Sequence, residues 1–469
     1  MKRFLARCAA FLFLLVVATD AHAQKIKAGV GQQDITPPIG YRMAGYFNER
    51  LSTGVHDPLW AKAIILDDGK QKLAMVFCDL VGISLNISAN ARAIASQRTG
   101  IPVANIFISA THSHTAPLFE GAIRNYLHDE AVKEFGKDPR EEVDYPKVLI
   151  GQIVEAIVEA NGKLKTAELQ TGIGTRDDIS FNRRFHMKNG TVAFNPGQLN
   201  TNIVKPAGPI DPDVGILFLR DPKKKQAIGG LTVFAMHADC VGGTDFSADY
   251  PFYLETRLKQ ALGTNYLSAF AAGASGDINQ INVKTKDPFK GFEAAEKYGR
   301  ALGESVLREM PSLKTVKKPS FAVKTETILA PIQEVTPERL ASAKEKMSKL
   351  TDSSASFFLK VEAVKAIDLA EKGPRWPMEV QVFRLDADTA LVGLPCEVFV
   401  ELGLAIKKAS PFKKTLVMSI CNDRPSYVPT QKAFSEGSYE VTNARVKPET
   451  GEMLVETAVK LLAALDLKN

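Results

Sequence analysis

The chain has 469 residues, of which 45% are hydrophobic, 24% charged and 8% aromatic, and it contains five cysteines. This composition is typical of a globular protein and excludes both a disordered chain and a small scaffold stabilised by disulfides. The formal net charge of +6 is mild and the basic residues do not cluster, which argues against nucleic acid as the main ligand.

The amino-terminal segment 1–23 has the pattern of a secretory signal peptide. Basic residues between Lys2 and Arg7 precede the apolar run 9–18, and the tripeptide Ala-His-Ala at 21–23 offers a small-x-small cleavage site. The apolar run is shorter than the roughly 20 residues that a membrane-spanning helix requires. We therefore expect cleavage after Ala23, a secreted or periplasmic protein, and no transmembrane segment in the mature chain.

Predicted strands and helices alternate along the rest of the chain. Strand patterns occupy 60–66, 72–78, 105–110, 215–220, 230–236, 267–272, 380–385, 389–394 and 415–420. Helical spacing of apolar residues occupies 148–160, 253–262, 293–309, 398–408 and 451–465. The order predicts an α/β fold, with mixed β-sheets flanked by helices in a single large catalytic domain over 24–469.

The segment 336–372 differs from its surroundings because it is charged and rich in Ala and Lys. We interpret it as a helical surface insertion of one or two helices. Its charges predict a face that is exposed to solvent.

Four cysteines remain after removal of the signal peptide: Cys78, Cys240, Cys396 and Cys421. In an oxidising compartment they could form two disulfides. Three of them lie beside polar motifs at predicted strand ends, where buried free thiols are equally compatible with the pattern. The sequence leaves both alternatives open.

Polar side chains directly follow five of the predicted strands. These strand-end segments are Thr111–His114, His237–Asp239, Gly273–Asp277, Cys396–Glu397 and Cys421–Asp423. In α/β proteins, ligands bind in the crevice outside the carboxyl ends of the strands. A single polar strand end would mean little, but five of them predict one common site.

Three of the seven histidines, His112, His114 and His237, lie at these strand ends. Neutral imidazoles together with a carboxylate such as Glu397 are the usual ligands of a catalytic zinc ion. His112 and His114 are two residues apart on an extended segment, so both project to the same side. The pair therefore permits two ligands, or one ligand and one residue that contacts the substrate.

A set of short motifs follows one order from residue 29 to the last predicted helix. They are GVGQQDIT at 29–36, SATHSHT at 109–115, FNR at 181–183, FAMH at 234–237, LPCEVF at 394–399 and Cys421-Asn422 followed by YVPT at 427–430. This ordered set resembles the neutral/alkaline (non-lysosomal) ceramidase family. The resemblance covers that family's amino-terminal catalytic domain only, because the chain ends soon after the tyrosine motif.

The resemblance implies a zinc-dependent amidohydrolase that cleaves the linear amide of a ceramide-like or other N-acyl substrate through zinc-activated water. It implies His112, His237, Glu397 and Tyr427 as the zinc ligands. His114 and Arg183 would face the substrate: an imidazole can pass a proton to the leaving amine, and a cation beside the Tyr427 hydroxyl can stabilise an oxyanion. The implied partner is a lipid-like or small N-acyl molecule, reached through transient contact with a membrane surface.

One motif departs from the family pattern. The segment Gly276–Asn282 reads GDINQIN where the family has G-D-x-S-P-N, so Asp277 is kept but Asn279 replaces a serine. We count both with the candidate catalytic residues, although an amide cannot serve as a hydroxyl nucleophile. Two alternatives therefore stay open: a noncatalytic metal-containing binding protein on the same scaffold, and a metal hydrolase of a different ester or amide.

Four further residues have competing interpretations. Asp79 follows a buried strand and either supports a metal ligand or caps a turn. Asp239 and Asp249 flank the Gly242-Gly243 loop. They could contact the substrate or a second metal, but exposure of the loop to solvent is the simpler expectation. Tyr439 lies in a loop rich in motifs and is a lesser candidate for lining the pocket.

Overall fold

The computed structural model describes residues 26–352, 354–424 and 426–467, so the predicted signal peptide lies outside the described residues. The strands are β1 (Ile26–Asp34), β2 (Gly54–Val55), β3 (Trp60–Asp67), β4 (Lys72–Cys78), β5 (Ile106–Ala110), β6 (Lys165–Thr175), β7 (Phe181–Asn182), β8 (Arg184–Met187), β9 (Val192–Phe194), β10 (Ile203–Pro206), β11 (Asp213–Arg220), β12 (Ala227–Phe234), β13 (Asp245–Phe246), β14 (Leu267–Ala272), β15 (Ile278–Asn279), β16 (Lys314–Thr315), β17 (Ala322–Pro331), β18 (Arg375–Arg384), β19 (Thr389–Gly393), β20 (Glu397–Val398), β21 (Lys414–Met418) and β22 (Tyr427–Val428). The helices are α1 (Leu85–Thr99), α2 (Ala122–Phe135), α3 (Tyr145–Gly162), α4 (Tyr250–Leu262), α5 (Phe292–Glu309), α6 (Pro337–Met347), α7 (Phe357–Ala370), α8 (Val400–Ala409), α9 (Gln431–Glu436), α10 (Tyr439–Asn443) and α11 (Thr450–Ala463), with short 3₁₀ turns at Val103–Asn105 and Met310–Ser312.

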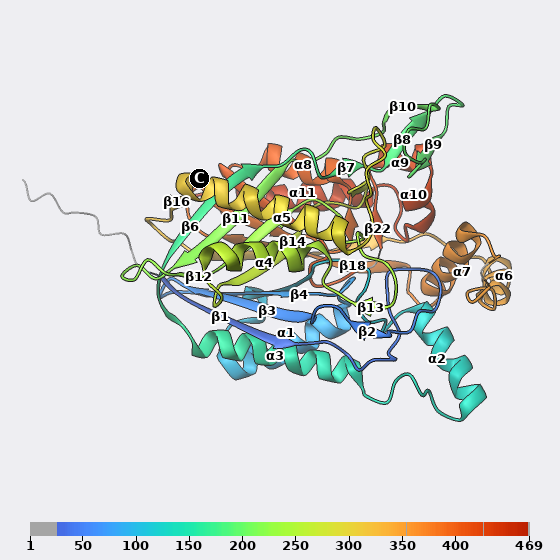
Figure 1. Cartoon of the computed structure of the whole chain (residues 1–469), viewed down its shortest axis with the longest axis horizontal. Helices are drawn as coiled ribbons and strands as arrows, with labels where there is room; N and C mark the ends of the chain where they lie inside the picture. Colours follow the sequence, from blue (N-terminus) through green and yellow to red (C-terminus); the bar gives the residue numbers. More distant parts are fainter. Residues whose placement is uncertain (1–25, 353, 425, 468–469) are drawn as a thin grey trace, which may run out of the picture.

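Two mixed sheets form the centre of the molecule (Figure 1). The larger follows the order β14-β12-β11-β6-β1-β3-β4-β5, with β16 added beside β6, and the smaller follows β17-β18-β19-β21. The pairs β12/β14, β4/β5 and β19/β21 are parallel, whereas the remaining neighbours in these two sheets are antiparallel. These mixed sheets and their flanking helices confirm the predicted fold class.

The two sheets pack face to face, and helices cover their outer faces. Leu217 and Leu231 of the larger sheet share a buried cluster with Phe383 and Leu416 of the smaller sheet. On the other face of the larger sheet, α3 packs against β1 and β3, α4 packs against β14, and α5 packs against β6 and β11. Helices α8 and α11 cover the smaller sheet. Because both faces of each sheet are buried, the sequences of the strands are nearly continuous apolar runs.

Several elements follow the sequence predictions closely. Strand β14 has the predicted bounds, and β3 and β4 form the predicted antiparallel hairpin with Asp67 opposite Lys72. Among the described helices, none combines the length and the apolarity needed to cross a membrane. The four cysteines that the structure describes are buried free thiols, so the disulfide alternative is wrong for them.

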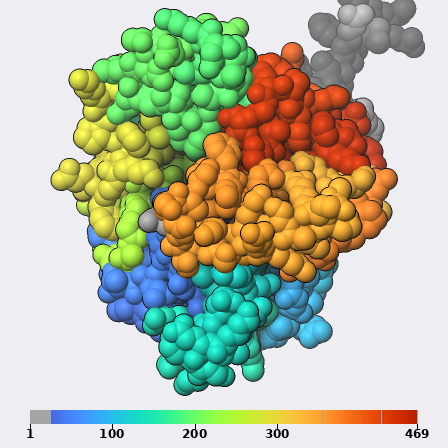
Figure 2. All heavy atoms as spheres, turned by 90° about the vertical axis from the view of Figure 1, so that its right-hand side faces the viewer, coloured from blue at the N-terminus to red at the C-terminus, as the bar shows by residue number. Residues whose placement is uncertain are grey.

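The segment 336–372 forms two helices as predicted, but its expected solvent-exposed face is only partly correct. Helix α7 buries one face, including Val361, Val364 and Leu369, and packs against α2 and α10. Two of its lysines are buried as well: Lys360 Nζ donates to the Leu350 carbonyl at 3.0 Å, and Lys365 Nζ donates to the Thr442 carbonyl at 2.9 Å. Figure 2 shows α6 and α7 (orange) across the middle of one end of the molecule.

Gly31 allows β1 to pack closely against α3. A Cβ atom at this position would lie 2.5 Å from the Ala156 carbonyl oxygen and 2.8 Å from the Ala160 nitrogen. We expect Gly31→Ala to lower the free energy of unfolding by about 1–3 kcal/mol, because backbone atoms must move apart. Gly151→Ala is the matched control: it lies in α3 with open space around it, and we expect it to be neutral or to stabilise by up to about 1 kcal/mol. Urea unfolding of both variants measures the difference, and equal stabilities would contradict this close packing.

Candidate metal centre

The strand ends that carry polar motifs come together in the structure. The Ala110 amide at the end of β5 donates to the Ile420 carbonyl, and the Ser419 hydroxyl donates to the Gly273 carbonyl. Sharp local turns accompany this convergence, because His112 and Cys396 have positive φ angles of 73° and 74°. Such angles are unfavourable for residues other than glycine and are typical of functional sites.

His112, His237 and Glu397 bring three ligand atoms to one point. The Glu397 Oε2 atom lies 3.3 Å from His112 Nε2 and 3.4 Å from His237 Nε2. Each imidazole donates its Nδ1 hydrogen to a backbone carbonyl, His112 to Val81 at 2.7 Å and His237 to Ser275 at 2.8 Å. These bonds fix the tautomer in which Nε2 presents a lone pair, as is usual for histidines that bind a metal.

The arrangement leaves buried electron pairs that need a cation. Burial, reinforced by the nearby Arg183 charge, lowers the pKa of His237 well below its usual range, so its imidazole is neutral. Among the described residues, His237 Nε2 and Glu397 Oε2 find no hydrogen-bond partner although both atoms are buried. Unpaired buried acceptors are costly. A metal ion between them would satisfy all three ligand atoms.

Tyr427 lies beside this group because β20 and β22 pair in parallel, with Glu397 opposite Tyr427. Its ring is parallel to the His237 imidazole, with an interplanar angle of 6° and centroids 6.4 Å apart. The side chain is buried. The structure therefore brings all four residues proposed as metal ligands into one neighbourhood.

His114 also belongs to this neighbourhood. Its Nε2 atom lies 3.2 Å from His112 Nε2, and the ligand atoms of His112, His114 and His237 all lie within 4.8 Å of one another. The His114 side chain is 13% exposed, compared with 1% for His237, so it lies on the solvent side of the group. The geometry is compatible with either role expected from the sequence, a further ligand or a residue that contacts the substrate.

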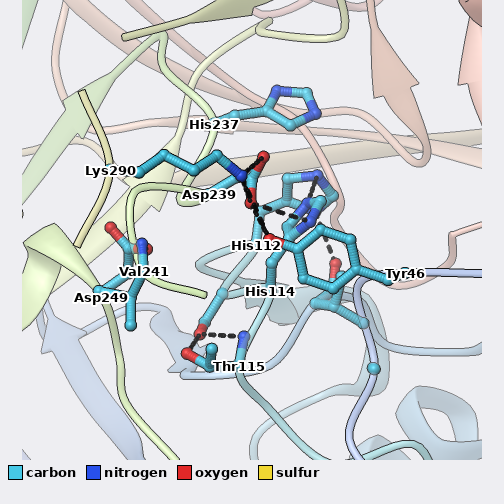
Figure 3. Close-up of polar contacts among 12 residues, drawn as sticks. Tyr46, His112, His114, Thr115, His237, Asp239, Val241, Asp249 and Lys290 are labelled. Atoms are coloured by element: carbon cyan, nitrogen blue, oxygen red, sulfur yellow. Dashed lines mark hydrogen bonds and ion pairs between the residues drawn. The ribbon is translucent and has the colours of Figure 1, made fainter. Parts of the chain in front are cut away.

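Polar residues lie next to His114 at the edge of the metal group (Figure 3). Asp239 Oδ1 lies 3.8 Å from His114 Nδ1, accepts a hydrogen bond of 2.7 Å from the Tyr46 hydroxyl, and lies 3.4 Å from Lys290 Nζ. Sequence reasoning did not single out Tyr46 or Lys290. The expectation of a solvent-exposed Asp249 is wrong: its carboxylate is fully buried and accepts hydrogen bonds from the Val241 and Tyr250 amides.

Arg183 is held in place by a buried carboxylate. Its Nε atom donates to Glu440 at 2.8 Å, and its Nη2 atom donates to the Gly276 carbonyl at 2.7 Å. The guanidinium lies 5.5 Å from the centroid of the Tyr427 ring, so it is next to the metal group. Glu440, fully buried, also pairs with Arg184 Nη1 at 3.0 Å, and the sequence motifs gave no indication of this role.

Asp277 and Asn279 have internal partners. Asp277 accepts hydrogen bonds from Asn182 Nδ2 at 2.7 Å and from the Val400 amide at 2.9 Å, and burial raises the pKa of its carboxyl to about 6. Asn279 donates to Asn195 at 3.0 Å and accepts from the Ile281 amide at 3.1 Å. Both side chains hold loops together at the site, so this geometry indicates a positioning role for each of them.

Two other acidic groups have structural partners. Asp79 accepts a hydrogen bond of 3.0 Å from the Trp60 amide at the start of the neighbouring strand β3, so this bond joins two strands and does not cap a turn. A second cluster with metal-ligand spacing contains His128, Asp138 and Glu141. Its carboxylates already pair with Arg42 and Arg124, so their charge is neutralised within the protein.

Comparison with known proteins identifies the family. Residues 26–280 match the model of the neutral/alkaline non-lysosomal ceramidase family, amino-terminal domain, which is more than half of the chain. The chain belongs to this ceramidase family. Membership implies a hydrolase that acts on an amide bond.

Solved ceramidase structures share the fold. A neutral ceramidase from Pseudomonas aeruginosa is 19% identical, with a TM-score of 0.72 over 95% of this chain and 75% of that chain. A ceramidase complexed with C2 is 17% identical, with a TM-score of 0.71 over 95% of this chain and 76% of that chain. At these identities the likeness establishes the ceramidase fold, and the roles of individual residues rest on the geometry above.

Proposed function

We propose that this ceramidase-family member is a zinc-dependent amidohydrolase that cleaves a ceramide-like N-acyl substrate. The observation that carries the proposal is the meeting of His112 Nε2, His237 Nε2 and Glu397 Oε2 within 3.3–3.4 Å contacts in a buried site. Two imidazoles and a carboxylate are the protein ligands found in many catalytic zinc sites. The amide-hydrolysing family supplies the reaction class.

The residues present fit a zinc ion. His112, His237 and Glu397 would hold it, with Tyr427 as the fourth ligand, and the unpartnered His237 and Glu397 atoms are those that it would satisfy. When bound, zinc would polarise the substrate carbonyl and lower the pKa of a water molecule at the site to about 7.

The surrounding side chains would act on the substrate itself. Arg183 remains a cation, because Tyr427 and Glu440 outweigh the effect of burial and raise its pKa. Fixed by Glu440, it would stabilise the negative charge that develops on the carbonyl oxygen. His114, on the solvent side of the group and 3.8 Å from Asp239, would accept a proton from the attacking water and pass it to the leaving amine.

We also propose that the chain is exported, because segment 1–23 has the pattern of a secretory signal peptide. Its substrate would then be met outside the cytoplasm, as a dissolved N-acyl molecule or during transient contact with a membrane surface.

The test is amine release by purified, zinc-loaded protein. We expect turnover of N-acyl sphingosines or related N-acyl amines, and loss of that turnover in Glu397→Ala, since the variant lacks a metal ligand. Glu334→Ala is the control, because the Glu334 side chain is 90% exposed. Turnover that survives in Glu397→Ala would contradict the proposal, as would hydrolysis of phosphoesters alone. Zinc binding without turnover of any N-acyl substrate would favour the noncatalytic alternative that Asn279 suggested.

A further inference from the structure

A continuous row of aromatic rings leads from the candidate metal centre to the surface. The Tyr427 ring contacts Tyr439, with centroids 5.5 Å apart, and Tyr439 contacts Phe357 at 5.2 Å. Phe357 in turn contacts Phe47 at 5.6 Å and Phe358 at 5.6 Å. The five residues come from three segments that are far apart in the sequence, so the row is formed by the tertiary fold.

Exposure rises along this row from the centre outward. Tyr427 is 4% exposed and Tyr439 is 8% exposed, whereas Phe357 and Phe358 are 44% and 47% exposed. Phe357 and Phe358 are adjacent residues in the first turn of α7, and nearly half of each side chain is exposed to solvent. They therefore stabilise the folded chain less than buried rings would. Exposed apolar surface that is continuous with a buried site marks a ligand-binding surface.

The position of Phe357 is fixed by the docking of α7. Lys365 Nζ of α7 donates to the Thr442 carbonyl of α10 at 2.9 Å, and Asp368 of α7 pairs with Arg445. Helix α10 carries Tyr439 and the Arg183 partner Glu440. Helix α7 is therefore attached to the element that carries Tyr439 and Glu440, and Figure 2 shows it (orange) at the surface, across the middle of the face turned to the viewer.

The two sides of the metal group differ in character. Tyr46, Asp239 and Lys290 place polar atoms beside His114, as Figure 3 shows, whereas the rings of Tyr439 and Phe357 extend outward from Tyr427. An N-acyl substrate has the same polarity, with an amide and head group at one end and an apolar chain at the other.

We propose that Phe357, with Phe47 and Tyr439, binds the acyl chain of the substrate and sets the preference for chain length. This inference rests on the proposed function and extends it. A long chain would cover the exposed rings of Phe357 and Phe358, whereas an acetyl group would reach only the inner residues. Each methylene placed on an apolar surface adds to the discrimination between substrates.

The experiment compares palmitoyl with acetyl amides of the same amine, as dissolved monomers, in the full-length zinc protein. We expect Phe357→Ser to lower the palmitoyl-to-acetyl ratio of kcat/KM by about tenfold, and Phe357→Leu to restore most of the ratio. Phe135→Ser is the matched control, since Phe135 is 56% exposed on α2, and it should leave the ratio unchanged. An unchanged ratio in Phe357→Ser would overturn the inference. So would a loss confined to substrates in phosphatidylcholine vesicles, which would indicate membrane contact instead.

A binding measurement separates this inference from the proposed function. We expect the fluorescent fatty acid cis-parinaric acid to bind the wild type, to bind Phe357→Ser about tenfold more weakly, and to bind Phe135→Ser normally. If no N-acyl substrate is turned over, the proposed function fails, yet this pattern would still support an acyl-chain site. Equal binding to all three proteins would overturn it.

Discussion

Replacing His237 with alanine should remove zinc from the protein and lower turnover by about a thousandfold, since a bound metal supplies several kcal/mol of transition-state stabilisation. His237 Nε2 is buried and finds no hydrogen-bond partner among the described residues, as expected of an atom that binds the metal. The substitution removes one protein hydrogen bond, from His237 Nδ1 to the Ser275 carbonyl, and the fold should persist. Metal analysis of the purified variant, with circular dichroism as the check on folding, measures the effect.

A second histidine variant provides the control. His128 belongs to the other cluster with metal-ligand spacing, where Arg42 and Arg124 neutralise the carboxylates. We expect His128→Ala to keep about one zinc per chain and nearly full activity. Full zinc retention in both His112→Ala and His237→Ala would contradict the assignment of His112 and His237 as zinc ligands. Loss of zinc in His128→Ala alone would contradict it as well.

Glu440→Ala should lower the free energy of unfolding by about 3–5 kcal/mol, the effect typical of removing one partner from a buried ion pair. Glu440 is fully buried and pairs with both Arg183 and Arg184, at 2.8 and 3.0 Å. Its removal leaves two buried cations without their shared carboxylate. Turnover should fall as well, because the Arg183 guanidinium loses the bond that orients it beside Tyr427.

Urea unfolding of Glu440→Ala and Glu155→Ala measures this effect. Glu155 pairs with Arg98 at the surface, where both side chains are more than 40% exposed, so we expect its loss to cost less than about 1 kcal/mol. The loss of unfolding free energy in Glu440→Gln should lie between the losses in these two variants, because an amide keeps one acceptor oxygen but not the negative charge. Similar stabilities of Glu440→Ala and Glu155→Ala would rule out a central role for this buried network.

The fold could be predicted where apolar residues repeat strongly. Strand β14 and the β3–β4 hairpin consist of apolar residues almost throughout, and their predicted bounds agree with the structure to within a residue. Helix α1 was missed because its buried face consists largely of small residues, Ala91, Ala95 and Ser88, which produce no apolar stripe. The buried lysines of α7 misled the interpretation of 336–372, since only the tertiary structure supplies the carbonyl partners of their ammonium groups.

The candidate site could be located from the sequence because it lies at strand ends. Polar residues that follow buried strands identified His112, His237 and Glu397, and the structure brings them together. The partners that hold the site could not be predicted in this way. Glu440 lies 257 positions from Arg183, and the hydrogen bonds of Asp277 to Asn182 and Val400 depend on how separate loops pack.

The most direct test of the metal centre is anomalous diffraction at the zinc absorption edge from crystals of the zinc-loaded protein. We expect a strong peak within about 2 Å of His112 Nε2, His237 Nε2 and a Glu397 carboxylate oxygen. A map without a peak at this position, or with one only beside His128, Asp138 and Glu141, would contradict this expectation.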